Sequence, residues 1–169
     1  MEIRKLLKFE HAHIVRDCHT ERCKFNIHGH SYKVEIFLSA FALDKAGMVV
    51  DFALVKKYFP VVDMWDHAMS VWEKDLPTLQ ESVKTFNQRW IVTPFNTSAE
   101  NMAVYFMKYA CEKAIPAILA DFPEYFSLEC SKIIVHETDT GCAVATQEDV
   151  SLGRYDLEDV IYSEGCLNG

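Results

Sequence analysis

The chain has 169 residues, of which 50% are hydrophobic and 25% charged, and its formal net charge is −8. This length predicts one domain over residues 1–169 with its own hydrophobic core. A nucleic-acid partner held through its phosphates would need a basic face, so this net negative charge predicts no nucleic-acid partner. The opening residues do not resemble a signal peptide and no apolar run could cross a bilayer, which predicts a cytoplasmic protein without a membrane partner. In that reducing compartment the six cysteines should be thiols.

The first half of the chain predicts strands. Residues 3–15 alternate between apolar and polar side chains, as a half-buried strand does. The polar segment 16–27 predicts a loop, and residues 29–41 alternate again. Turn residues over 42–47 and an apolar start at 48–50 then predict an antiparallel hairpin.

Helices are expected next. Asp51 fits the N-cap of a helix over 52–63, which Pro60 should kink or shorten. Residues 64–96 have no clean period and contain at most a short helix around 75–88.

A second helix is expected to start at a capping box. Thr97 fits its N-cap and Glu100 its third helical position. Helical spacing then continues to about residue 120. Pro116 predicts a bend within this helix.

The last elements are a strong strand over 128–137 and a short one near 141–145, followed by an acidic, weakly patterned tail from 146. This order of elements predicts an α+β fold, with helices packed on one face of an antiparallel sheet.

Three histidines can meet on one face of that sheet. His28 and His30 are two residues apart on one strand, so both rings point the same way, about 7 Å apart. His13 lies near the end of the preceding strand, and His11 on the same strand face is an alternative. Three imidazoles without an obvious fourth protein ligand predict a catalytic Zn²⁺ site with an open position. The alternative interpretation is a group of histidines without a metal.

Cys23 lies five residues before His28, in the polar loop. A thiol beside Zn²⁺ and basic residues can act as a base or a nucleophile. Cys23 could instead be a fourth ligand that closes a structural site, and its neighbour Cys18 could take the reactive role.

Asp66-His67 and Glu137 are further candidates. A carboxylate beside an imidazole can orient it for proton transfer. Glu137 ends an apolar strand, where a buried carboxylate needs a partner such as the guanidine-like edge of a planar ligand, or a lysine. Glu100 has its capping role as the alternative explanation.

Together these motifs resemble the 6-pyruvoyltetrahydropterin synthase family over roughly residues 5–145. The motifs that carry the resemblance are Phe9-x-x-x-His13, Cys23 with His28-Gly29-His30, Val50-Asp51-Phe52, Asp66-His67, Ser98-Ala99-Glu100-Asn101 and Glu137-Thr138. The sequence looks closest to the bacterial branch, whose members make 6-carboxy-5,6,7,8-tetrahydropterin in the queuosine pathway.

The resemblance implies roles for nine residues. The Zn²⁺ ligands would be His13, His28 and His30. The residues of proton transfer would be Cys23, Asp66 and His67, coupled to Glu137. The residues that bind substrate would be Glu137, Glu100 and Ser98.

The resemblance also implies a tunnelling (T-) fold, in which sheets from several subunits close a barrel, and a hexamer of two trimers with active sites between subunits. The implied activity is a zinc-dependent lyase that converts 7,8-dihydroneopterin triphosphate to 6-carboxytetrahydropterin, with release of acetaldehyde and triphosphate. The alternatives are a 6-pyruvoyltetrahydropterin synthase, which retains the side chain, and a zinc-containing pterin-binding protein without turnover.

The sequence departs from the family pattern at four places. Four residues separate Cys23 from the HGH motif, where three or five are usual, and His11 replaces a small residue. The segment 68–96 is longer than in compact bacterial members, and the tail from about 146 is extra. We expect the long segment to cover the site or a subunit interface.

Overall fold

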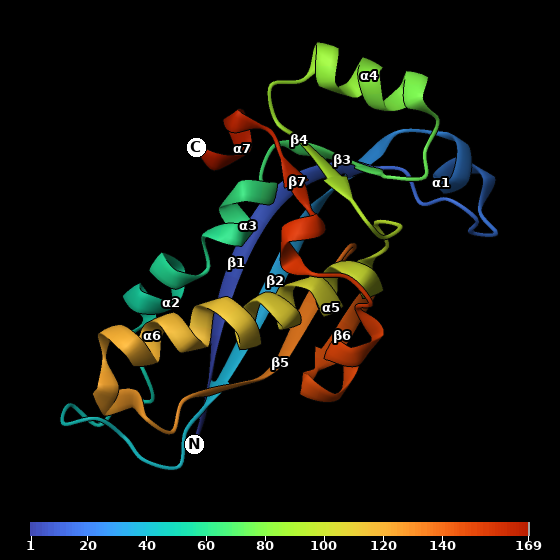
Figure 1. Ribbon diagram of the computed structural model, residues 1–169. Helices are drawn as coiled ribbons and strands as arrows, with labels where there is room; N and C mark the ends of the chain where they lie inside the picture. Colours follow the sequence, from blue (N-terminus) through green and yellow to red (C-terminus); the bar gives the residue numbers. More distant parts are fainter. Residues whose placement is uncertain (169) are drawn as a thin grey trace.

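The structure is a computed structural model, and it describes residues 1–168 (Figure 1). A seven-stranded sheet has the order β6-β5-β2-β1-β3-β4-β7. Its strands are β1 (Glu2–His13), β2 (His28–Ser39), β3 (Ala68–Trp72), β4 (Trp90–Thr93), β5 (Glu129–His136), β6 (Cys142–Thr146) and β7 (Ile161–Tyr162).

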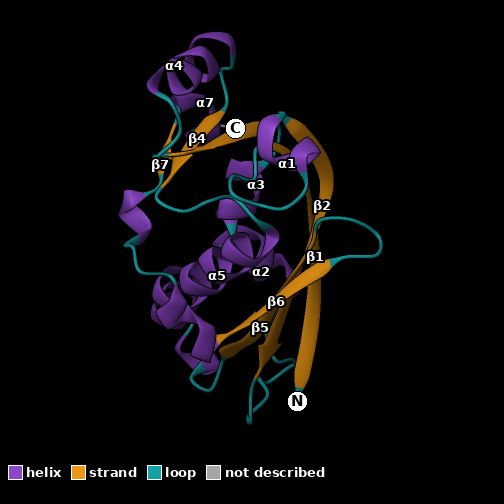
Figure 2. Ribbon diagram, turned by 90° about the vertical axis from the view of Figure 1, so that its right-hand side faces the viewer, coloured by secondary structure: helices purple, strands orange, loops and turns teal. Residues whose placement is uncertain are grey.

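The helices lie mainly on one side of the sheet (Figure 2), as predicted for an α+β fold, but the helix over 77–86 packs through Leu79 and Val83 on the opposite face, against Met69, Val71 and Val92. They are α1 (Glu21–Phe25), α2 (Phe52–Tyr58), α3 (Pro60–Trp65), α4 (Pro77–Phe86), α5 (Ala99–Tyr109), α6 (Ile115–Asp121) and α7 (Glu164–Leu167). Among the described residues, no helix is both long and apolar enough to span a bilayer.

The long antiparallel pair of β1 and β2 forms the centre of the sheet. All twelve residues of each strand are in register, from Glu2 opposite Ser39 to His13 opposite His28. Alternate side chains of β2, starting at Tyr32, are fully buried against the helices. This alternation is the half-buried pattern predicted from the sequence.

The sheet is mixed rather than wholly antiparallel. Strands β6, β5, β2 and β1 pair antiparallel, whereas β3 is parallel to β1, and β4 is parallel to β3. The parallel strands come from segment 68–96, in which the sequence predicted only the helix that α4 confirms. The tail adds β7, which pairs antiparallel with β4.

The strand expected at 48–50 is absent from the sheet. Asp44 closes a tight turn by accepting hydrogen bonds from the backbone N–H groups of Ala46 and Met48, both at 2.8 Å. Asp51 then caps α2 by accepting from the N–H of Ala53 at 2.8 Å, as predicted. Too few residues remain between turn and cap to form a ladder, so this segment packs into the core as a loop.

Pro60 acts as the sequence predicts, and Pro116 follows a change in the helical hydrogen-bond pattern. The helix expected over 52–63 breaks at Phe59 into α2 and α3, and Pro60 occupies the first turn of α3. The longer helix passes through a π-helical turn, Ala110–Ala114, just before Pro116. A proline has no N–H to give to the preceding turn, which explains the change in hydrogen-bond pattern there.

Helix α5 begins one residue later than predicted. Its N-cap is Ser98, whose side chain accepts from the N–H of Asn101 at 3.4 Å, and Thr97 is buried outside the helix. Glu100 is therefore the second helical residue and cannot complete the capping box that the sequence suggested.

Candidate metal and pterin site

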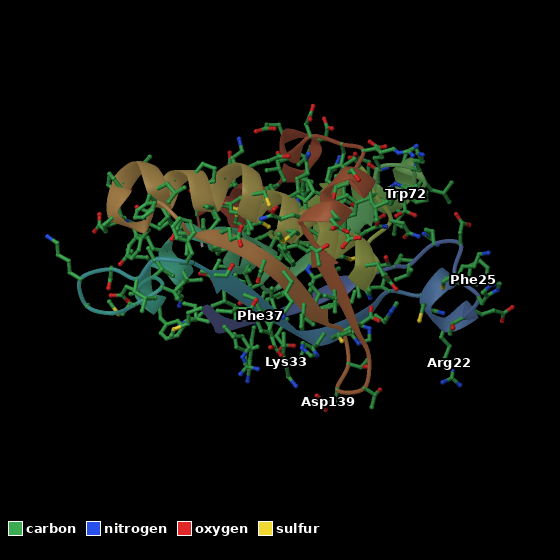
Figure 3. The ribbon with its side chains drawn as sticks, turned by 90° about the horizontal axis from the view of Figure 1, so that it is seen from below. Arg22, Phe25, Lys33, Phe37, Trp72 and Asp139 are labelled. Atoms are coloured by element: carbon green, nitrogen blue, oxygen red, sulfur yellow. The ribbon has the colours of Figure 1, made fainter. Side chains whose placement is uncertain are left out.

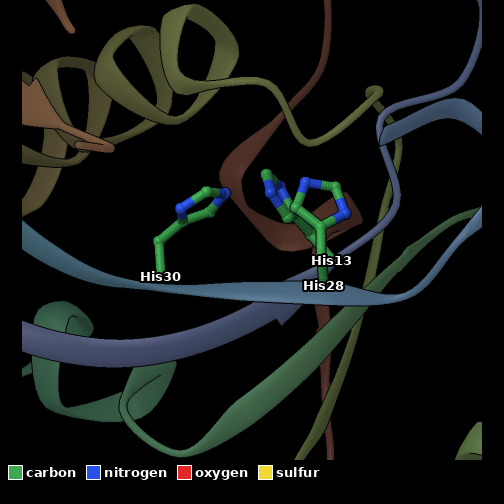
Figure 4. A group of neighbouring side chains, drawn as sticks. All are labelled: His13, His28 and His30. Atoms are coloured by element: carbon green, nitrogen blue, oxygen red, sulfur yellow. The ribbon is translucent and has the colours of Figure 1, made fainter. Parts of the chain in front are cut away.

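Three imidazoles from β1 and β2 converge at one end of the sheet (Figure 4). His13 and His28 are directly opposite each other in the β1–β2 register, and His30 follows on the same face of β2. The ring centroids are 4.5 Å apart for His13 and His28, 5.4 Å for His13 and His30, and 5.2 Å for His28 and His30. One nitrogen from each ring lies within 4.8 Å of the other two.

Backbone carbonyls orient two of these rings. His13 Nδ1 donates to the carbonyl of Thr97 at 2.6 Å, and His28 Nδ1 donates to that of Asn26 at 3.0 Å. A carbonyl can only accept, so the proton of each neutral ring is on Nδ1 and the lone pair on Nε2 is free for a metal. Burial also lowers the pKa of His13 to about 4, which keeps its ring neutral.

This donor set fits a metal ion. Three neutral imidazoles on rigid strands suit Zn²⁺, Cu, Fe or Ni, and they leave part of the coordination sphere to other ligands. The cluster can therefore hold a metal ion, as the sequence suggested.

His11 is not part of the cluster. Its Nδ1 donates to the carbonyl of Trp65 at 3.0 Å, and its Nε2 accepts from the Ser70 hydroxyl at 2.8 Å. Burial lowers the pKa of His11 to about 3. Both ring nitrogens are thus used by the protein, which removes His11 as the alternative to His13.

Cys23 lies in α1 and lines a cavity of about 420 Å³ beside the cluster. His28, Ser98, Glu100, Glu137 and Cys18 line the same cavity. Burial raises the pKa of the Cys23 thiol, and negative charge on Cys18 and Glu137 raises it further. Without a nearby cation the thiol therefore stays protonated.

Glu137 points toward the histidines. Its Oε1 accepts a hydrogen bond from the Tyr32 hydroxyl at 3.1 Å, and it lies 3.5 Å from His13 Nε2 and 3.8 Å from His30 Nε2. The sequence also allowed a lysine as the partner of the Glu137 carboxylate, but no lysine is among these contacts.

Asp66 and His67 lie elsewhere. An Asp66 oxygen is 2.9 Å from His67 Nδ1, and His67 is largely exposed, with a left-handed φ of 53°. Glu10 and Ala12, which alternate with His13 along β1 and so point to the opposite face, line a second cavity together with His67. Within one chain, this pair does not meet the cavity of Cys23.

Two residues of the site escaped sequence reasoning. Tyr32 belongs to the buried face of β2, where its pattern indicates only core packing. Thr97 resembled a helix cap, yet its carbonyl orients His13 across 84 residues of chain. The position of Tyr32, two residues after the HGH motif on the same strand face, was the one feature of the sequence that could have placed it in the site.

Comparisons with known proteins point to one family. A family model described as 6-pyruvoyl tetrahydropterin synthase matches residues 2–148. The 6-carboxy-5,6,7,8-tetrahydropterin synthase of Helicobacter pylori strain J99 is 35% identical over 151 residues, which are 89% of this chain and 74% of that protein. The protein of the same name in H. pylori strain 26695 is 34% identical over the same shares.

Solved structures share the fold. The 6-pyruvoyl tetrahydropterin synthase of Plasmodium falciparum aligns with a TM-score of 0.62 at 17% identity, over 86% of this chain and 96% of that one. An uncharacterized protein from Wolinella succinogenes aligns with a TM-score of 0.60 at 18% identity, over 87% and 98%. The predicted T-fold is confirmed, and a single chain supplies an open sheet with β6 and β7 at its edges.

Proposed function

Because the chain belongs to the 6-pyruvoyl tetrahydropterin synthase family, we propose that it is a zinc-dependent carbon–carbon lyase that makes 6-carboxy-5,6,7,8-tetrahydropterin. The substrate would be 7,8-dihydroneopterin triphosphate, which reacts with water to give this product, acetaldehyde and triphosphate. The names of the two H. pylori relatives support this product. In a cytoplasmic setting the reaction would serve queuosine biosynthesis.

One observation carries the proposal. The cluster of three imidazoles that can hold a metal reaches, through His28, the same cavity as the Cys23 thiol and the Glu137 carboxylate. A metal centre, a removable thiol proton and a carboxylate together suit proton transfers on a polar, planar substrate.

The residues would divide the work as follows. Zn²⁺ on the three imidazoles would polarise the substrate's side-chain hydroxyls as a Lewis acid and, by its charge, favour the Cys23 thiolate. Cys23 would take a proton from the substrate side chain. Glu137 would accept hydrogen bonds from the N–H edge of the pterin, with Ser98 and Glu100 in the same cavity.

The triphosphate needs cations. Of the three considered from the sequence, Arg16 pairs with the buried Asp75 at 2.5 Å, and Lys33 pairs with Asp139 at 2.8 Å on the outer face of the sheet (Figure 3). Lys24 lies over the ring of its neighbour Phe25, next to Cys23. Lys24 is therefore our choice for a triphosphate contact.

The relay from Asp66 and His67 would come from a second copy of the chain. His67 lines a cavity with Glu10 and Ala12, on the face of the sheet opposite to the histidine cluster, so a neighbouring subunit would have to bring the pair to Cys23. This arrangement supports the homo-oligomer, a hexamer of two trimers, that the family resemblance implies.

The test is product identity. Purified, zinc-loaded protein is incubated with 7,8-dihydroneopterin triphosphate, acetaldehyde is measured by coupled NADH oxidation, and the pterin is identified by mass spectrometry. We expect acetaldehyde and triphosphate in equal amounts. A pyruvoyl product without acetaldehyde would instead establish the synthase that retains the side chain, and binding without turnover would establish a pterin-binding protein.

A further inference from the structure

The distances between the Glu137 carboxylate and two of the imidazoles fit ligands of one metal ion better than they fit hydrogen bonds. Its Oε1 is 3.5 Å from His13 Nε2 and 3.8 Å from His30 Nε2. Hydrogen bonds between nitrogen and oxygen are shorter, about 2.7–3.2 Å. Ligands about 2.0–2.1 Å from one tetrahedral ion are separated by about 3.3 Å, which is nearer to the observed spacing.

Tyr32 holds that same oxygen in place. Its hydroxyl donates to Glu137 Oε1 at 3.1 Å, and its side chain is completely buried, stacked on Phe9 with the ring centroids 5.0 Å apart. The hydroxyl also lies 3.3 Å from His13 Nε2, but its single proton is given to Glu137. The lone pair of His13 Nε2 and one lone pair of Glu137 Oε1 therefore both stay available.

The backbone fixes Glu137 from the other side. It follows the last residue of β5, and its N–H donates to the carbonyl of Gly141 at 3.2 Å across the turn that leads to β6. The side chain is only partly exposed and lines the cavity. Glu137 can thus reach either the histidine cluster or a molecule in the cavity by rotating its side chain alone.

We propose that Glu137 is the fourth protein ligand of the metal while the cavity holds no pterin, and that the incoming pterin draws this carboxylate away. The idea rests on the proposed function, which supplies the metal and the substrate class. One carboxylate among three neutral imidazoles also offsets part of the charge of a divalent ion in a half-buried site. The position left by Glu137 becomes open only when a substrate is present to use it.

The test measures metal binding without turnover. Metal-free wild-type protein, Glu137→Gln and Glu100→Gln are titrated with Zn²⁺ against a chromophoric chelator, and visible spectra are recorded for the Co²⁺-loaded forms. Glu100 lines the same cavity and carries the same charge, so its variant controls for lost negative charge. We expect Glu137→Gln to weaken Zn²⁺ binding by more than about tenfold and to change the Co²⁺ spectrum, and Glu100→Gln to match wild type.

Two results would overturn the assignment. Wild-type affinity and spectrum in Glu137→Gln would show that the carboxylate does not coordinate the metal. Weaker binding with an unchanged Co²⁺ spectrum would show that Glu137 acts only through its neighbours. Neither measurement involves 7,8-dihydroneopterin triphosphate, so an inactive protein would count against the proposed function and leave this result readable.

Discussion

At the residue scale, His11 shows how burial fixes a protonation state. The ring donates to the carbonyl of Trp65 and accepts from Ser70, an arrangement that only the neutral form satisfies without rearrangement. Because the side chain is buried, its pKa falls to about 3 in the folded protein. The unfolded chain would keep the ordinary pKa of about 6.5.

This difference makes stability depend on pH. Below pH 6.5 the unfolded chain binds a proton that folded His11 does not, so stability falls as the pH drops toward 3. Between pH 6.5 and 5.5 the loss from His11 should be about 1 kcal/mol. Urea unfolding of the metal-free wild-type protein and of His11→Gln at both pH values measures this loss of stability. His11→Gln should be less stable at pH 6.5 but lose less on acidification, and equal losses in both proteins would refute the assignment.

Cys23 gives a second prediction at this scale. Cys23→Ala should lower kcat by about 10²–10⁴-fold, the usual contribution of a general base, while zinc content and folding stay unchanged. Metal analysis, circular dichroism and the acetaldehyde assay measure these quantities. Cys18→Ala is the matched control from the same cavity and should remain active. Loss of both metal and folding in Cys23→Ala would instead indicate a structural site closed by the thiol.

At the element scale, Arg89 connects segment 68–96 to the corner that carries Asp66 and His67. Its guanidinium donates to the carbonyls of Asp66 at 2.7 Å and Asp63 at 2.8 Å, at the C-terminal end of α3, and also to that of Gly165 in α7. Carbonyls at a helix end lack partners within the helix and favour a cation. The long segment and the tail thus brace α3 together.

Removing that brace should be costly. Arg89→Met leaves these carbonyls without a charged donor and should reduce the free energy of unfolding by about 2 kcal/mol. Arg22→Met is the control, because Arg22 is exposed and extends away from α1 (Figure 3), and it should change stability by less than about 0.5 kcal/mol. Urea denaturation compares the two, and similar stabilities would contradict the role of Arg89.

The same scale explains which elements the sequence predicts. Strands β1 and β2 have twelve residues each and one buried face, so their alternation is plain. Strand β3 has five residues, four of them buried on successive positions, so it has no period to detect, and β7 has only two residues. Their places in the sheet depend on tertiary contacts rather than on local pattern.

At the scale of the whole molecule, the residues of the proposed site lie on two faces of one sheet. Residue types and spacing identified the three histidines and Cys23, because metal and thiol chemistry restrict the choice. The orientation of His13 by Thr97 and the separation of His67 from Cys23 could not be predicted, because both depend on how distant segments pack.

Subunit mixing tests the division. Cys23→Ala and His67→Ala proteins should each be nearly inactive, but mixed after dissociation they should regain up to about a quarter of wild-type activity, since one site in four would combine intact residues from two chains. The acetaldehyde assay reports the recovery. A mixture of Cys23→Ala with His30→Ala, whose defects lie on the same side of the sheet, should stay inactive. No recovery in the first mixture would mean that the subunits do not share sites.

Gly29, between two of the metal-binding candidates, lies close against the backbone of the neighbouring strand. A Cβ atom there would lie 2.9 Å from the carbonyl oxygen of His11 on the neighbouring strand, closer than such atoms normally come. A methyl group on Gly29 would push β1 and β2 apart beside the His13–His28 pair, and this would increase the distance between the two imidazole rings. A design that transfers these three histidines to a different hairpin would therefore also need a glycine between the two histidines of the second strand.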